Sequence, residues 1–244
     1  MPFRHPFACV LIVLLSMTVA PSRTARAEEA ASESPRPQPL KEGDRVVFLG
    51  DSITQAGAGD GGYVTLVREA IANRQPELGV EIIGAGISGN RVPDLQRRLE
   101  RDVLAKKPTV CVIYIGINDV WHLERDRGTS KEDYEAGLND LLVKLKDAGV
   151  RAVLCTPSVI GEKTDGTNKL DGLLDEYSAI SSRVAERNGV QVIDLRVKFI
   201  EHLKEENEQN AEKNVLTTDG VHLNAAGNEF VAERMLEGLG VARK

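Results

Sequence analysis

Short apolar runs alternate along the chain with longer amphipathic stretches. Five runs rich in Val, Ile and Leu show little polar alternation, which is typical of strands covered on both faces. The predicted strands occupy residues 45–49, 80–84, 109–115, 151–156 and 190–194. The stretches between them follow the helical period, and the predicted helices occupy residues 62–73, 93–105, 131–147, 171–187, 197–212 and 224–237.

This alternation of strand and helix predicts the fold class. A chain that returns through a helix after each strand forms right-handed crossovers between parallel strands. We therefore predict an α/β domain with three layers, α/β/α, doubly wound around a five-stranded parallel sheet. Ligands of such domains bind beyond the carboxyl ends of the strands. The loops that follow the strands are therefore where chemistry is expected.

Four polar blocks lie at these ends or just before the last predicted helix. They are Gly50-Asp51-Ser52, Gly86-Ile87-Ser88-Gly89-Asn90, Gly116-Ile117-Asn118-Asp119 and Asp219-Gly220-Val221-His222. The first block places a serine after a buried strand, and the last places an Asp and a His three residues apart. These three residue types can supply a nucleophile, an orienting carboxylate and a base. The pattern predicts acyl transfer.

In this order, the four blocks resemble those of the SGNH/GDSL hydrolases, a family of serine esterases and lipases. The resemblance covers about residues 44 to 237 and implies the flavodoxin-like SGNH hydrolase fold. It implies that Ser52 is the nucleophile, His222 the general base and Asp219 the residue that orients His222. It also implies an oxyanion hole made by the amides of Ser52 and Gly89 and the side chain of Asn118. The sequence matches the pattern at each of these positions.

Each of these residues also has an ordinary structural interpretation. A serine after a strand is often a helix N-cap. Asn118 can close an Asx-turn, and Asp219 can stabilise a turn with Gly220. The pattern Gly-x-Ser-x-Gly is missing, because Thr54 stands where its second glycine would be, which argues against an α/β-hydrolase elbow.

The neighbours of the blocks suggest further roles. Trp121 and His122 directly follow the third block, and we predict that they wall the substrate pocket. We interpret Asp51 and Asp119 as residues that brace their loops.

Two glycine-rich segments resemble a different kind of site. Residues 57–62 and 84–89 both fit the Gly-x-Gly-x-x-Gly turn that binds dinucleotides. Neither is followed by an acidic residue at the end of the next strand to hold a ribose. The sequence therefore predicts no cofactor. It predicts no metal either, because no group of Cys, His or carboxylate residues has ligand spacing.

The first residues differ in composition from the rest of the chain. A basic start, an apolar run over residues 7–20 and Ala25-Arg26-Ala27 predict a signal peptide over residues 1–27. A retained anchor is the alternative. Residues 28–43 are rich in Glu, Ser, Pro and Ala and predict a disordered linker. Residues 44–244 then form the catalytic domain of a secreted or periplasmic protein, with no stable membrane insertion after cleavage.

Charge and cysteines narrow the possible partners. The chain has a net charge of −6, and loss of the leader, with three arginines and no acid, changes it to about −9. This acidic balance argues against nucleic acid as a partner and disfavours anionic lipid. Cys111 lies early and Cys155 late in their predicted strands, which favours buried thiols over a disulfide. The sequence leaves the oligomeric state open.

Together these features predict a secreted serine esterase that hydrolyses carboxylic esters through an acyl-enzyme. The loops over residues 55–62 and 161–168 are small and polar, and aromatic residues make up only 4% of the chain. We therefore predict short acyl groups, acetyl above all, on a small-molecule or saccharide ester. A lysophospholipase or thioesterase, a peptidoglycan-directed esterase, a flavodoxin-like cofactor protein and a non-catalytic ligand-binding module are the alternatives.

Overall fold

The computed structural model of the chain describes residues 1, 3, 37–123 and 127–241. The folded domain lies within residues 34–244. The predicted signal peptide and most of the predicted linker lie outside the described residues. No helix among the described residues is long and apolar enough to cross a membrane.

Five parallel strands form a single sheet in the order β2-β1-β3-β4-β5. They are β1 Arg45–Gly50, β2 Glu81–Gly86, β3 Val110–Tyr114, β4 Arg151–Cys155 and β5 Gln191–Ile193. In this register Leu49 of β1 pairs with Ala85 of β2 and with Ile113 of β3. The predicted fold class is confirmed, as are all five strands. The strand order reverses between β1 and β3, where a doubly wound sheet opens its ligand crevice.

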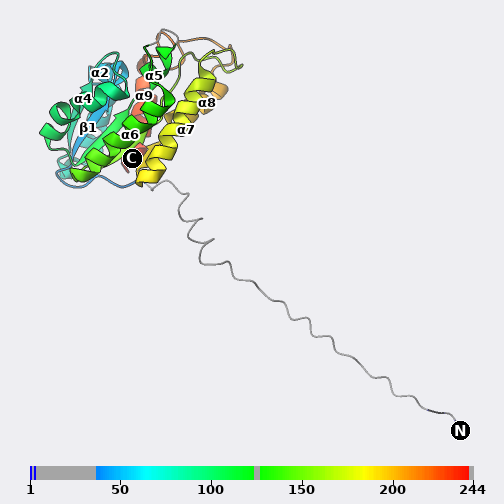
Figure 1. Cartoon of the computed structure of the whole chain (residues 1–244), viewed down its shortest axis with the longest axis horizontal. Helices are drawn as coiled ribbons and strands as arrows, with labels where there is room; N and C mark the ends of the chain where they lie inside the picture. The colour runs from blue at the N-terminus through cyan, green and yellow to red at the C-terminus, as the bar shows by residue number, and fades with distance from the viewer. Residues whose placement is uncertain (2, 4–36, 124–126, 242–244) are drawn as a thin grey trace. The chain divides into compact units, whose positions relative to one another are not determined.

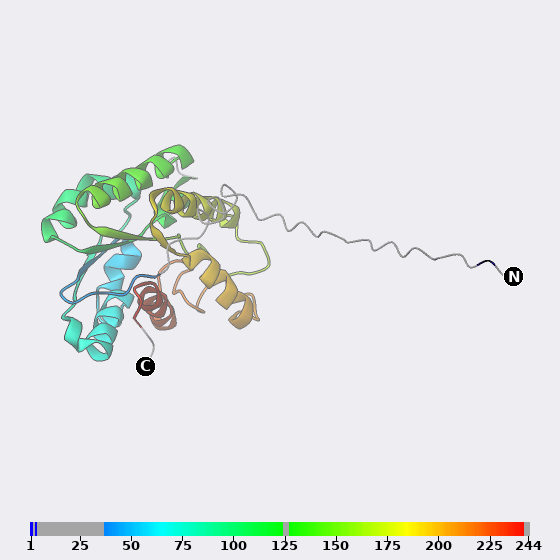
Figure 2. The ribbon, with the colours of Figure 1, turned by 90° about the horizontal axis from the view of Figure 1, so that it is seen from below.

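Helices cover both faces of the sheet (Figures 1 and 2). One face carries α4 Val92–Asp102, α6 Lys131–Asp147 and α7 Asp171–Asn188, and the other carries α3 Tyr63–Arg74 and α9 Ala225–Gly238. Helix α8, Leu195–Glu206, packs on α9 through Phe199 and Phe230, whose ring centroids lie 5.2 Å apart. The three predicted layers are therefore present.

Two short helices were not predicted, and both directly follow a strand. Helix α2, Ser52–Gly57, follows β1, and α5, Ile117–Trp121, follows β3. They are too short to display an amphipathic period, so the hydrophobic pattern does not reveal them. Two 3₁₀ turns, Pro76–Leu78 and Leu104–Lys106, are equally short. The short α-helices matter most, because they carry two of the four blocks.

One predicted helix is shorter in the structure. Helix α8 was predicted to run to residue 212 but ends at Glu206, because Asn207 leaves the helical conformation. The Asn207 amide instead donates hydrogen bonds to the carbonyl oxygens of Glu162 and Ala211, at 2.7 and 2.8 Å. The described end of the linker, residues 37–43, packs on the domain, and Leu40 is only 6% exposed. The polar composition of residues 28–43 gave no sign that Leu40 packs on the domain.

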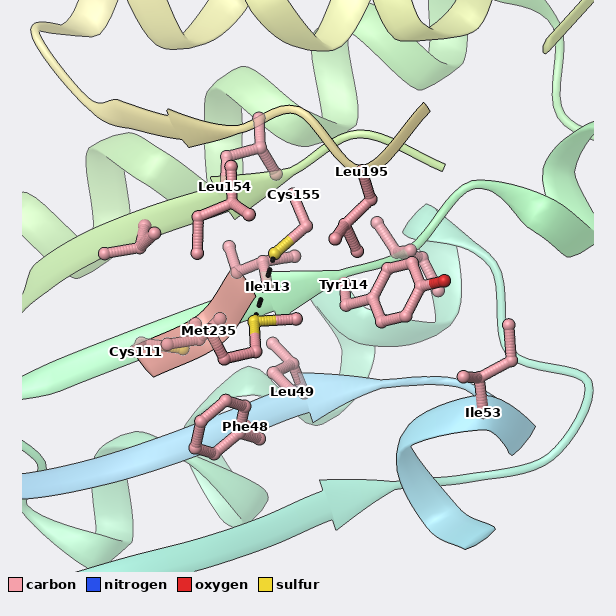
Figure 3. Packing of buried hydrophobic residues seen from close by; sticks show 14 of the residues in the cluster. Phe48, Leu49, Ile53, Cys111, Ile113, Tyr114, Leu154, Cys155, Leu195 and Met235 are labelled. Carbon is pink, nitrogen blue, oxygen red and sulfur yellow. Dashed lines mark hydrogen bonds between the residues drawn. The ribbon is translucent and has the colours of Figure 1, made fainter. Parts of the chain in front are cut away.

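The core between the sheet and α9 is closely packed (Figure 3). Met235 of α9 lies over Phe48 and Leu49 of β1 and receives a contact from the Cys155 thiol at 3.9 Å. Cys111 and Cys155 are both free and buried, as predicted. Burial raises the pKa of the Cys111 thiol to about 12, so this thiol stays protonated and unreactive at neutral pH.

Candidate active site

The first block turns the chain sharply from β1 into α2. The Asp51 side chain caps α2 by accepting a hydrogen bond from the Ile53 amide at 2.9 Å. Ser52 is the first residue of this helix and is half-buried. The cap holds the serine hydroxyl just beyond the carboxyl end of β1.

Ser52, His222 and Asp219 form a hydrogen-bonded row. Ser52 Oγ lies 2.9 Å from His222 Nε2, across 170 residues of sequence. His222 Nδ1 lies 2.7 Å from Asp219 Oδ2. With the proton on Nδ1, the His222 ring donates to the carboxylate and its Nε2 can accept the serine proton. The structure thus brings together the three residues that the sequence singled out.

The Asp219 carboxylate is held in place by its own loop. Its Oδ1 accepts hydrogen bonds from the His222 and Val221 amides, at 2.8 and 3.0 Å. Burial, the largest single effect, raises the pKa of Asp219. The hydrogen bonds from the His222 ring and from the two amides together outweigh burial, so the pKa lies below its usual value. Asp219 is therefore a carboxylate at neutral pH.

A tight turn presents this Asp-x-x-His block. Thr217 and Leu223 form an antiparallel bridge, and the Thr218 amide donates to the His222 carbonyl at 2.8 Å. Gly220 closes the turn with a φ of 96°, a conformation that L side chains rarely adopt. The turn therefore accounts for the three-residue spacing between Asp219 and His222.

Asn118 lies in α5 and connects the first three blocks. Its Nδ2 donates to the Asn90 carbonyl at 3.1 Å and to Asp51 Oδ2 at 3.3 Å. Gly89, in the second block, has a φ of 75°. Among the described residues, the Ser52 and Gly89 amides have no protein acceptor. Both amides and the Asn118 side chain are thus carried by the loops after β1, β2 and β3.

Arg98 is a residue of this region that the sequence did not single out. Its guanidinium is 6% exposed and donates to the Gly50 carbonyl at 2.7 Å, the Ala85 carbonyl at 2.8 Å and Asn90 Oδ1 at 2.7 Å. It thereby ties the end of β1 to the end of β2 and to the second block. The helical period carried a signal for it, because Arg98 lies three residues after Leu95 on the flank of the apolar face, whereas Arg97 and Arg101 lie on the exposed face.

The first and third blocks each contain a buried carboxyl group, Asp51 and Asp119. Burial raises the pKa of Asp51 to about 7 and that of Asp119 to about 6. Asp119 Oδ1 accepts a hydrogen bond from the Val92 amide at 3.1 Å, which joins α5 to the start of α4. Both residues are positioned to brace loops.

A cavity of about 430 Å³ opens beside Asp219. Trp121, Gly161, Asn168 and Gly220 contribute to its wall. The Trp121 side chain is 39% exposed. The His122 ring stacks against Trp121, with centroids 6.1 Å apart and planes inclined by 24°. A flat indole at such a wall can stack on an apolar face of a ligand.

Packing explains the glycine-rich segments. A Cβ on Gly86 would lie 2.1 Å from the Gln55 amide nitrogen, and one on Gly57 would lie 2.5 Å from the Tyr63 ring. These glycines allow α2 to approach β2 and α3 closely. Within the part of the chain that the structure describes, no group of three or more His, Cys, Asp or Glu side chains could hold a metal ion.

The order and placement of the blocks agree with a known family. The sequence model of the GDSL-like lipase/acylhydrolase family matches residues 48–230. The chain belongs to this family. The predicted resemblance is confirmed, and the protein is a carboxylic ester hydrolase.

Individual relatives of this GDSL hydrolase are esterases. This chain is 33% identical to an acetylxylan esterase of Geobacillus stearothermophilus, over 81% of this chain and 94% of the relative. The crystal structure of an acetyl xylan esterase, AlAXEase, superposes with a TM-score of 0.78 at 42% identity, over 80% of this chain and 99% of the other. An isoamyl acetate-hydrolyzing esterase 1 homolog of Rattus norvegicus is 25% identical over 77% of this chain and 78% of its own.

Proposed function

We propose that this GDSL hydrolase is a serine esterase that removes acetyl groups from carbohydrate. In this proposal Ser52 is the nucleophile, His222 the general base and Asp219 the residue that orients the base. The single observation that carries it is the 2.9 Å contact between Ser52 Oγ and His222 Nε2. A hydroxyl in this contact can transfer its proton as it attacks a carbonyl carbon.

The acylation half of the reaction follows from this contact. Ser52 Oγ forms a bond to the ester carbonyl carbon while His222 Nε2 takes the serine proton. The carbonyl oxygen becomes an oxyanion, which the Ser52 and Gly89 amides and the Asn118 side chain stabilise by hydrogen bonds. Asp219 stabilises the imidazolium that forms.

The tetrahedral intermediate then breaks down. His222 returns its proton to the alkoxy oxygen, the bond between carbon and this oxygen breaks, and the sugar leaves as an alcohol. Water attacks the acetyl-serine while His222 again accepts a proton. The bond between the acyl carbon and Ser52 Oγ then breaks as His222 returns its proton to Oγ. Acetic acid leaves and loses its proton to solvent, which gives acetate. The cycle needs only water as a co-reactant.

Two observations support a short acyl group on a sugar. The similar proteins include acetylxylan esterases of the same fold. Large apolar side chains that are exposed in the described part of the folded domain are few, namely Ile87, Trp121, Val143 and Val197. A lipase needs a contiguous apolar entrance for a long chain. The cavity beside Asp219, with its Trp121 wall, suits a saccharide better.

The proposal also includes export. The composition of residues 1–27 supports a signal peptide, and an exported enzyme would meet polysaccharides. The net charge of −6 supports a saccharide ester rather than a nucleic acid as the partner.

A substrate panel tests the proposal. Initial rates on p-nitrophenyl acetate, octanoate and palmitate are compared with acetate release from an acetylated xylooligosaccharide. We expect rates to fall with acyl length and the oligosaccharide to be deacetylated. Faster turnover of the long chains would instead favour a lysophospholipase or thioesterase.

Labelling with a fluorophosphonate tests the nucleophile. The reagent should attach to Ser52, and Ser52→Ala should lose both labelling and turnover while keeping the thermal melting temperature. Ser182→Ala, on helix α7, is the matched control and should behave as the unaltered protein does. Absence of labelling in the unaltered protein would favour a non-catalytic ligand-binding module.

A further inference from the structure

Glu162 carries a carboxylate that is completely buried. The residue is 0% exposed, although it lies in the polar loop between β4 and α7. In the described part of the chain it forms no ion pair with a lysine, arginine or histidine. A buried charge of this kind needs other partners, because burial without hydrogen bonds is strongly unfavourable.

Three consecutive backbone amides supply these partners. Glu162 Oε2 accepts from the Val215 amide at 2.8 Å, and Oε1 accepts from the Leu216 and Thr217 amides at 2.7 and 2.6 Å. The backbone of Glu162 is held as well. Its amide donates to the Glu212 carbonyl at 2.9 Å, and its carbonyl accepts from Asn207 at 2.7 Å. The carboxylate is therefore a fixed anchor for residues 215–217.

This anchored segment leads directly into the Asp-x-x-His turn. Thr217 forms the bridge to Leu223 that closes the turn, and its hydroxyl accepts from the Gly220 amide at 3.0 Å. Next to Glu162, the Gly161 amide donates to the Gly220 carbonyl at 2.8 Å. The loop that contains Glu162 thus contacts the turn at its start and at its tip.

We infer that Glu162 is a positioning residue of the esterase. Its carboxylate fixes the start of the turn that carries Asp219 and His222, and so sets the reach of His222 Nε2 to Ser52 Oγ. The same loop lines the cavity beside Asp219 through Gly161. Glu162 therefore fixes the position of His222 relative to one wall of the cavity beside Asp219. This inference rests on the proposed function.

Substitution of Glu162 tests the inference. Glu162→Gln keeps one acceptor oxygen but places an amide group among three N–H donors, and Glu162→Ala removes all three hydrogen bonds. A small displacement of a catalytic group is costly, so kcat on p-nitrophenyl acetate should fall about 10-fold in the first variant and about 100-fold in the second. KM for this small ester should stay unchanged.

Active-site titration separates positioning from folding. Fluorophosphonate labelling to completion counts the folded sites, and kcat is expressed per labelled site. A residue that only maintained the fold would lower the number of sites and leave kcat per site unchanged. Glu208→Gln is the matched control, because it removes the same charge from an exposed position just after Asn207, and its kcat should match that of the unaltered protein.

The outcomes are distinct. A loss of kcat per site in Glu162→Gln, with an unaffected Glu208→Gln, supports the inference even when Glu162→Ala fails to fold. An unchanged kcat per site in Glu162→Gln overturns it while leaving the proposed function intact. An unaltered protein that neither labels nor turns over esters overturns the proposed function and this inference together.

Discussion

Asn118 Nδ2 lies 3.3 Å from Asp51 Oδ2, a longer hydrogen bond than the 3.1 Å contact from the same nitrogen to the Asn90 carbonyl. The contact to Asn90 orients the amide, and the longer contact to Asp51 occupies its second proton. An oxyanion that accepts from Asn118 would share or replace the longer of these two hydrogen bonds, which is the smaller loss. A buried carboxyl and a proposed oxyanion donor are thus coupled.

Asn118→Ala should remove one oxyanion donor. We expect kcat to fall by about 10²–10³-fold, because the donor acts mainly on charge that develops in the transition state. KM should change little. The measurement is steady-state kinetics on p-nitrophenyl acetate, and a variant with a raised KM and normal kcat would make Asn118 a substrate-binding residue instead.

Asp51 should make the fold less stable as the pH rises. Its pKa is raised from 3.8 to about 7 in the folded state, so between these values the folded state holds more protons than the unfolded state. The free energy of unfolding therefore decreases as the pH rises across this interval. The total decrease, complete once the pH exceeds the folded-state pKa, is at most about 4 kcal/mol. Burial of Asp119 adds an effect of the same sign up to about pH 6.

Asp51→Asn removes this titration and isolates the contribution of Asp51. Urea unfolding between pH 4 and pH 7 should show the variant gaining stability relative to the unaltered protein as the pH rises. Asp147→Asn, at the exposed end of α6, should follow the unaltered protein. Parallel curves for the Asp51 variant and the unaltered protein would mean that Asp51 does not titrate in this range.

Asp219→Asn should lower kcat without abolishing turnover. The amide cannot favour the His222 tautomer with the proton on Nδ1 as a carboxylate does, and replacement of the equivalent group in other triads costs up to about 10⁴-fold. Because hydrogen bonds lower the pKa of Asp219, the unaltered protein should keep this group ionised at mildly acidic pH. Asp147→Asn again serves as the control, and full activity in Asp219→Asn would remove Asp219 from the mechanism.

Arg98→Met should destabilise the domain and slow the reaction. The methionine cannot donate to the Ala85 carbonyl or to Asn90 Oδ1, and the Gly50 carbonyl keeps only its 3.2 Å hydrogen bond from the Ile87 amide. Buried groups that lose a partner cost about 1–3 kcal/mol each. We expect a loss of about 3 kcal/mol in urea unfolding together with a lower kcat. Arg101→Met is the matched control on the same helix, since the Arg101 side chain is 73% exposed and such changes usually stay within about 0.5 kcal/mol.

The sequence by itself determined the five strands, the longer helices and the four blocks. Each strand is a local apolar run, which periodicity locates. Each block is a short contiguous motif, so it can be read from the sequence beside its strand or helix. The Asp-x-x-His spacing is also local, because one turn over residues 217–223 carries both side chains. The fold class followed from the alternation of elements, since right-handed crossovers leave few topologies.

Only the tertiary structure decided which polar residues are buried between elements. Arg98 lies three residues after Leu95, on the flank of the buried face of α4, but the helical pattern does not show that its guanidinium reaches the ends of β1 and β2. Glu162 is one acid in a polar loop, and its burial depends on the amides of residues 215–217, more than 50 residues away. Such contacts depend on how distant loops meet, which no local pattern encodes.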